Sequence, residues 1–283
     1  MNKPNQPTPT RYDAPAVFGP SLMPDRSACE DCENWTISFE TTRDAAARLL
    51  PRFFELDERA FVSVHRITYR GVDYLAGGEY RELAIGVDAV YNGPQETIKA
   101  AFTPVLWVDQ VSALVSGREL LGSPKVYGRF PDAQFPPGGA TFEAYEYDGR
   151  AINALLMRGE FRNLSTLPAK ALADVNARVK AMGVHTFGWK IIPSTEGAPD
   201  LDYPTLQLTR WQFDEARIGE GRISFLTPGP GEAPISARIM RVLADLPIKE
   251  YRKGLVARGA AVIERQMTRH LPLPERMATG RNL

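Results

Sequence analysis

The residue of this sequence best suited to chemistry is Lys125, which follows Pro124 in the segment Ser116-Gly-Arg-Glu-Leu-Leu-Gly-Ser-Pro-Lys-Val-Tyr-Gly128. A neutral lysine amine condenses with a ketone to form an imine. The protonated imine accepts electrons far better than the ketone does, so a neighbouring carboxylate or proton leaves more readily. This chemistry needs an uncharged amine, whereas an exposed lysine has a pKa of about 10.4 and is protonated at pH 7.

The residues around Lys125 favour burial of its amine. Pro124 removes a backbone donor and stiffens the approach, and the leucines at 120–121, Val126 and Tyr127 can supply apolar walls. Burial disfavours the charged form of a lysine and lowers its pKa. The alternative is an exposed loop lysine without a catalytic role.

Two cysteines, Cys29 and Cys32, form a Cys-x-x-Cys in a polar segment. Alone they supply half of a four-ligand zinc site, and His65, His185 and His270 are far away in the sequence. We therefore expect no metal and interpret the cysteines as ordinary surface thiols. The sequence also lacks the G-x-G-x-x-G, Walker A, H-E-x-x-H and G-x-S-x-G signatures.

Strand patterns predominate beyond an N-terminal segment, residues 1–31, which is rich in proline and polar residues and is expected to form an extended arm. Alternating or apolar runs predict strands at 35–40, 79–91, 98–108, 141–147, 151–161, 205–213 and 254–263. Proline and glycine clusters at 136–139 and 228–231 predict breaks between strands.

Three helices are predicted among these strands. Thr42 can cap one that Pro51 ends; Thr166 can cap a second that Gly183 ends; a third covers 235–243. Strands outnumber helices and rarely alternate with them, so the expected class is β-rich α+β with mostly antiparallel pairing. We interpret residues 1–283 as a single domain with the arm at its N-terminus.

The composition excludes several classes of partner. Lys+Arg and Asp+Glu both total 34, so no net charge favours nucleic acid or anionic lipid. No apolar run approaches the about 18 residues that span a bilayer, and the first fifteen residues contain no apolar core of a secretory signal. We expect a cytoplasmic protein with a small-molecule partner.

The lysine segment resembles that of acetoacetate decarboxylases, in which Gly-Arg-Glu-Leu is followed after three residues by Pro-Lys. The matching positions are Gly117, Arg118, Glu119, Leu120, Pro124 and Lys125. Two further matches follow in the same order, at 190–193 (Lys-Ile-Ile-Pro) and 245–250 (Asp-Leu-Pro-Ile-Lys-Glu). The resemblance covers roughly residues 32–263.

This resemblance implies large antiparallel sheets that form a cone or barrel, with a few helices outside. It also implies a homo-oligomer, a tetramer or larger, that acts on a keto acid without a cofactor. Lys125 would form the imine, and Glu82, in Tyr80-Arg-Glu82, would be the carboxylate beneath it and move protons. Arg118 and Glu119 would form a pair that positions the lysine loop.

Four positions depart from the patterns of the characterised relatives. True decarboxylases have an arginine where this chain has Cys32, a glutamate where it has His65, and often a second lysine where it has Val126. Relatives that condense pyruvate have a glutamine at the position of Leu121. A histidine in the pocket could assist at neutral pH, although a lone strand histidine is more often structural.

We therefore expect a Schiff-base carbon–carbon lyase of the aldolase–dehydratase type, acting on pyruvate or another 2-keto acid with an aldehyde. One alternative is a β-keto-acid decarboxylase of altered specificity. The other is a non-catalytic β-barrel that binds an apolar ligand.

Overall fold

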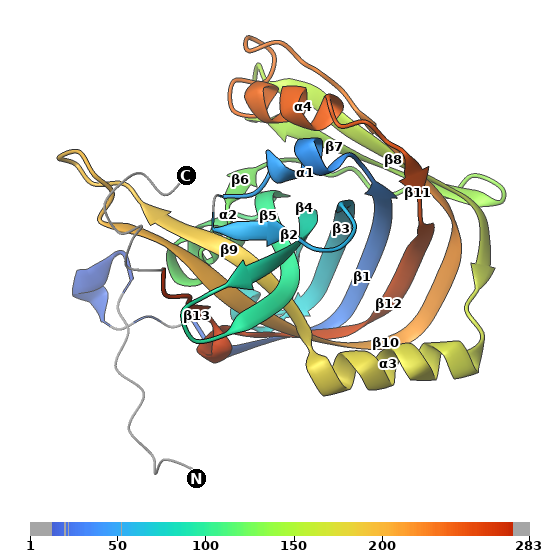
Figure 1. The fold of residues 1–283 in the computed structure, drawn as a ribbon, viewed down its shortest axis with the longest axis horizontal. Coiled ribbons are helices and arrows are strands. Elements are labelled where there is room, and N and C mark those ends of the chain that lie inside the picture. Colours follow the sequence, from blue (N-terminus) through green and yellow to red (C-terminus); the bar gives the residue numbers. More distant parts are fainter. Residues whose placement is uncertain (1–12, 20, 22, 52, 274–283) are drawn as a thin grey trace.

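A large mixed sheet dominates the part of the chain that the computed structural model describes, residues 13–19, 21, 23–51 and 53–273 (Figure 1). Its strands are β1 (Arg26–Glu40), β2 (Phe54–Leu56), β3 (Phe61–Val72), β4 (Gly78–Asn92), β5 (Thr97–Val108), β6 (Lys125–Tyr127), β7 (Gly139–Tyr147), β8 (Asn153–Thr166), β9 (Val184–Ile192), β10 (Leu201–Phe225), β11 (Glu250–Tyr251), β12 (Lys253–Glu264) and β13 (Arg269–His270). The predicted β-rich class is confirmed.

The helices are few and short. They are α1 (Arg43–Ala47), α2 (Val111–Ser116), α3 (Ala169–Met182) and α4 (Ala237–Ala244), with a π-helical turn η3 (Gly117–Leu121) and the 3₁₀ turns η1 (Ala16–Phe18), η2 (Asp73–Leu75) and η4 (Arg265–Met267). No helix in the described ranges has the length and apolar character needed to cross a bilayer.

The strand pairings run in the order β11-β1-β3-β4-β5-β9-β10-β8-β7. β12 pairs with both β1 and β10, so the pairings lead from β1 through β3, β4, β5, β9 and β10 back to β1. Between described strands, only β5–β6 and β5–β9 are parallel, which confirms the predicted antiparallel majority. The parallel partner β6 carries Lys125.

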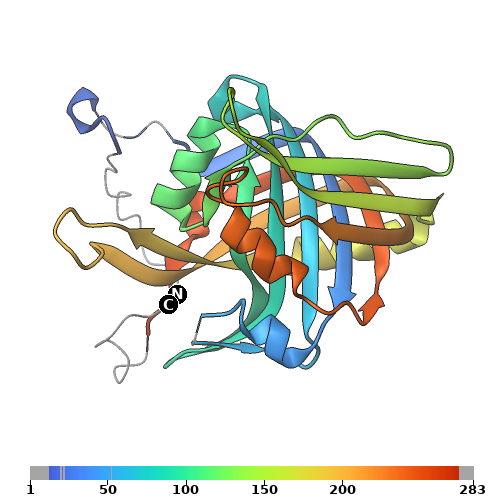
Figure 2. The ribbon, with the colours of Figure 1, turned by 90° about the horizontal axis from the view of Figure 1, so that it is seen from above.

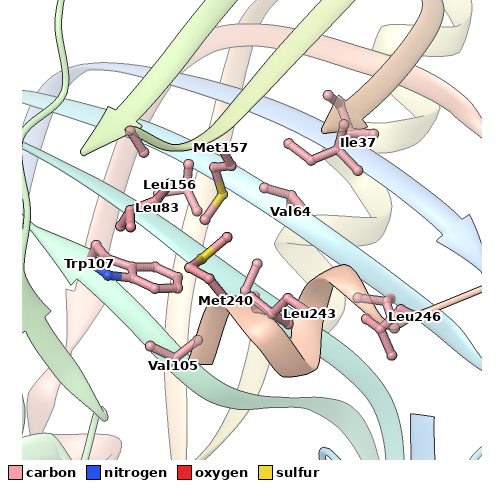
Figure 3. Packing of buried hydrophobic residues seen from close by; sticks show 14 of the residues in the cluster. Ile37, Val64, Leu83, Val105, Trp107, Leu156, Met157, Met240, Leu243 and Leu246 are labelled. Atoms are coloured by element: carbon pink, nitrogen blue, oxygen red, sulfur yellow. The ribbon is translucent and has the colours of Figure 1, made fainter. Parts of the chain in front are cut away.

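Successive strand residues point to opposite faces of this sheet. One face packs against β7, β8 and α4, and its core contains Trp107, Leu156, Met240 and Leu243 (Figure 3). In Figures 1 and 2, α4 lies across the molecule on the same side as β7 and β8.

The opposite face carries Tyr69, Tyr80 and Trp211 and is named here the lysine face. The rings of Tyr69 on β3 and Trp211 on β10 lie 6.1 Å apart, although β1 and β12 separate these strands in the pairing order. The sheet therefore curls around the lysine face.

The predicted helices are present, with one error at a helix start. Thr42 accepts a hydrogen bond from the backbone N–H of Ala45 and caps α1. Gly183, with φ of 67°, ends α3 as expected. Thr166 does not cap α3, because it is still paired with Arg217 at the end of β8.

Two expectations for the N-terminal region need correction. β1 begins at Arg26, within the predicted arm, while residues 1–12 lie outside the described ranges. The cysteines are not surface thiols: Cys29 and Cys32 are buried in β1. An irregularity between them brings both onto the lysine face, although strict alternation would place them on opposite faces.

Candidate active site

Lys125 lies in β6, directly after the turn that leaves η3. It pairs with Leu106 of β5, and only 6% of its surface is exposed. The alternative of an exposed loop lysine is therefore wrong. Because Leu106 belongs to the lysine face, the side chain of Lys125 is directed to that side of the sheet.

Glu82 is the nearest charged partner of this amine. Lys125 Nζ lies 3.2 Å from Glu82 Oε2, and Glu82 is 7% exposed. The β3–β4 register places Ile67 opposite Glu82 and Tyr69 opposite Tyr80, so these side chains share the lysine face. The structure thus brings together the two residues that the sequence assigned to proton transfer and imine formation.

Two tyrosines complete the surroundings of the amine. The hydroxyl of Tyr69 donates to Glu82 Oε1 at 3.2 Å, and the Tyr69 and Tyr80 rings stack with centroids 4.7 Å apart. The Tyr80 ring centroid lies 5.6 Å from Lys125 Nζ, within the range of a cation–π contact. Burial, followed by the charge of Glu82, raises the pKa of both phenols, so they remain neutral donors.

The sequence indicated Tyr80 but missed Tyr69. The signal was present in the alternation of β3 and β4, the two long strands that residues 73–77 join. Placing Tyr69 opposite Tyr80 would have put both rings beside Glu82.

The Gly-Arg-Glu-Leu motif wraps around the lysine as the π-helical turn η3. A Cβ on Gly117 would lie 2.5 Å from Lys125 Cδ, so this position needs glycine because the lysine stem crosses it. Arg118 donates to the carbonyl of Lys125 at 3.1 Å. Arg118 and Glu119 were predicted to position the lysine loop as a pair, and in the structure Arg118 contacts that loop. The charge of Glu119 acts on Lys190, where it partly opposes the lowering of the lysine pKa by burial.

His65 lies on the lysine face but away from the amine. It pairs with Ala84 in the β3–β4 register, and its Nε2 lies 4.0 Å from where a Cβ on Gly86 would be, in the direction opposite to Glu82. Its Nδ1 is 3.0 Å from the hydroxyl of Thr36. Burial lowers the pKa of His65 to about 4, so the ring is neutral at pH 7.

The other three residues at which this chain departs from its characterised relatives are Cys32, Leu121 and Val126, and they lie in different surroundings. Cys32 pairs with Tyr69 in the β1–β3 register, and its hydrogen bond with Cys29, together with burial, raises the pKa of its thiol. Leu121 is buried, and its carbonyl accepts from the hydroxyl of Thr205 at 2.8 Å. Val126 points to the face opposite Lys125 and packs against the core there.

A pocket of about 560 Å³ lies beside β6. Pro124 and Val126, on either side of Lys125, line it together with Arg118, but the Lys125 side chain does not. In the described ranges no group of three or more His, Cys, Asp or Glu side chains could hold a metal ion. The reactive groups that the structure brings together are thus an amine, a carboxylate and two neutral phenols.

Comparison with known proteins identifies relatives of this chain by sequence and by fold. The sequence model of the family described as acetoacetate decarboxylase (ADC) matches residues 6–269. Acetoacetate decarboxylase 1 of Bradyrhizobium diazoefficiens is 23% identical over 253 residues, which cover 87% of each chain.

Solved structures resemble the fold closely. An acetoacetate decarboxylase structure has a TM-score of 0.69 at 19% identity and covers 90% of this chain and 93% of its own. The enduracididine biosynthesis enzyme MppR, complexed with pyruvate, has a TM-score of 0.65 at 17% identity. The match covers 94% of this chain and 99% of the MppR chain. MppR is also known complexed with the condensation product of pyruvate and imidazole 4-carboxaldehyde.

Proposed function

The chain belongs to the acetoacetate decarboxylase family, and from this premise we propose that it is a Schiff-base lyase that acts on a keto acid through Lys125. The observation that carries the proposal is the buried pair of Lys125 Nζ and Glu82 Oε2, 3.2 Å apart. An isolated buried ammonium would be costly, whereas a carboxylate at this distance compensates the charge and can accept its proton.

The reaction begins when Lys125 transfers a proton to Glu82 and the neutral amine attacks the keto carbon. The carbinolamine loses its hydroxyl as water, with the proton supplied from Glu82, and leaves the protonated imine. Tyr69 donates a hydrogen bond to the second oxygen of Glu82 and holds that carboxylate in place. No cofactor is required for these steps.

We propose aldol addition and dehydration as the specific reaction. Deprotonation of a 2-keto acid imine next to the former carbonyl gives an enamine, which adds to an aldehyde; loss of water then gives the unsaturated product. The neutral Cys32 thiol supports this choice, because it offers no positive charge where decarboxylases have an arginine. The complexes of MppR with pyruvate and a condensation product agree with it.

Borohydride trapping tests the proposal. The wild type incubated with pyruvate and borohydride should gain one adduct with the mass of the keto acid less one oxygen, and Lys125→Ala should gain none. Lys190→Ala is a matched control, since Lys190 is also partly buried and its pKa is lowered by burial. A wild type that forms no adduct with any member of a keto-acid panel would refute the proposal.

Product analysis then separates the reaction types. Pyruvate with an aromatic aldehyde should give an absorbing unsaturated product. Carbon dioxide release from β-keto acids without that product would instead identify a decarboxylase. Tight binding of apolar ligands without an adduct would identify a binding protein.

A further inference from the structure

The pocket of about 560 Å³ beside β6 lies on the face opposite the Lys125 amine. Its lining residues are Arg48, Leu49, Pro104, Val105, Arg118, Ser123, Pro124, Val126, Trp189, Ile191, Arg238, Ile239, Val242 and Leu243. This volume is typical of sites for small organic ligands. The pocket is named here the arginine pocket.

Most of the side chains that line the arginine pocket are apolar, from its floor to its rim. Val105 of β5 and Leu243 of α4 form part of its buried floor and belong to the same core (Figure 3). At the rim, Val242 is 42% exposed and Ile191 is 37% exposed. A ligand with an apolar body would remove these side chains from water, which favours its binding.

The charge of the lining residues has one sign. Arg48, Arg118 and Arg238 are the charged side chains among them, and none of the lining residues is acidic. Within the part of the chain that the structure describes, no carboxylate lies within 4.0 Å of these guanidinium groups. The positive charges at the pocket therefore lack an anionic partner in the described chain.

We propose that the arginine pocket binds a monocarboxylate with an apolar body, at a site separate from the imine-forming lysine. The guanidinium groups recognise the carboxylate, since arginine bonds carboxylates through two parallel N–H groups. The aliphatic and indole walls hold the apolar body. The ligand needs no keto group, because the Lys125 amine lies on the other side of the main chain.

Titration calorimetry with two probes of the same shape tests this inference. 4-Phenylbutyrate should bind the wild type, and the neutral 4-phenylbutanamide should bind at least about tenfold more weakly. Arg238→Met should weaken the binding of phenylbutyrate roughly tenfold and leave the binding of the amide unchanged. Arg241→Met is the matched control, because Arg241 is exposed on the same helix, α4, but does not line the pocket.

Two further variants locate the site. Val242→Glu, which places a negative charge at the exposed rim, should abolish phenylbutyrate binding without disturbing the core. Lys125→Met should bind phenylbutyrate like the wild type. Loss of binding in Lys125→Met, equal binding of acid and amide, equal effects of Arg238→Met and Arg241→Met, or no binding of either probe would each overturn the proposal. Phenylbutyrate has no keto group, so failure of imine trapping does not affect this result.

Discussion

The lysine face and the arginine pocket hold positive charge in opposite ways. On the lysine face, one ammonium is buried, paired with Glu82 and covered by the Tyr80 ring. In the arginine pocket, Arg48 and Arg238 are exposed beside apolar walls and have no carboxylate nearby within the described chain.

This difference separates two functions that one cation could not combine. A lysine that must pass on its proton needs a base within hydrogen-bond distance to accept it. A group that must hold a ligand's carboxylate benefits from permanent charge and from the absence of an internal anion. The variants below test whether the two regions are independent.

Glu82→Gln should have the largest effect. It keeps the shape of the side chain but removes the group that accepts and returns the proton, so turnover should fall about 100-fold or more. Steady-state kinetics and the rate of borohydride trapping measure this loss. Glu79→Gln, at an exposed position of the same strand, is the control, and phenylbutyrate binding should be unchanged in both variants.

A substitution of His65 tests whether water is excluded from the part of the lysine face that lies away from the Lys125 amine. Its pKa of about 4 lies below the ordinary value of 6.5, so the unfolded state takes up a proton first as the pH falls. Stability from the neutral ring is therefore present above pH 6.5 and is lost progressively down to about pH 4, by about 2 kcal/mol at pH 5. Urea unfolding at pH 7 and pH 5 should show that His65→Gln reduces this loss; an unchanged difference would contradict it.

Gly117→Ala should disturb the amine through its stem. Gly117 has φ of −63°, which alanine adopts without strain, so the cost comes from the contact with Lys125 Cδ. We expect a loss of about 1–2 kcal/mol in the free energy of unfolding and roughly tenfold slower trapping. In Gly231→Ala the new Cβ meets nothing within 4 Å, so similar losses in that variant would exclude the steric explanation.

Tyr69→Phe should have the smallest effect. It removes one hydrogen bond to Glu82 and keeps the ring stacked on Tyr80. Turnover should fall about threefold to tenfold, as expected for one neutral donor to a carboxylate. Tyr127→Phe, at an exposed position of β6, should leave turnover unchanged; equal effects would show that the Tyr69 hydroxyl has no specific role.

The sequence predicted several strands well, because alternation is a local property, but its ranges omitted β3 and β9 and covered only 205–213 of β10. It placed strands within β4, β5, β7 and β12 to within a few residues. It missed α2, because Val111–Ser116 has only 6 residues and is too short to show a helical repeat. The cysteines were misplaced because a strand irregularity cannot be recognised from residue types alone.

The candidate site was predictable only in part. Lys125 and Glu82 were indicated by family resemblance, but their contact depends on a parallel pairing of β6 with β5 that leaves no local pattern. The sequence left open whether His65 faces the pocket; the structure puts it on the lysine face, with its Nε2 4.0 Å from where a Cβ on Gly86 would be. Arg118 was assigned a positioning role, and its bond to the Lys125 carbonyl gives that role a structural basis.

Residues 124–126 form a partition only one main chain thick between the two regions. Pro124 and Val126 line the arginine pocket, while the residue between them points to the other side. A substitution at either position that displaces the main chain also displaces the peptide units that carry the amine. Variation of ligand preference without loss of reactivity is therefore expected at the distant wall, on α4, on β9 and at residues 48–49 after α1.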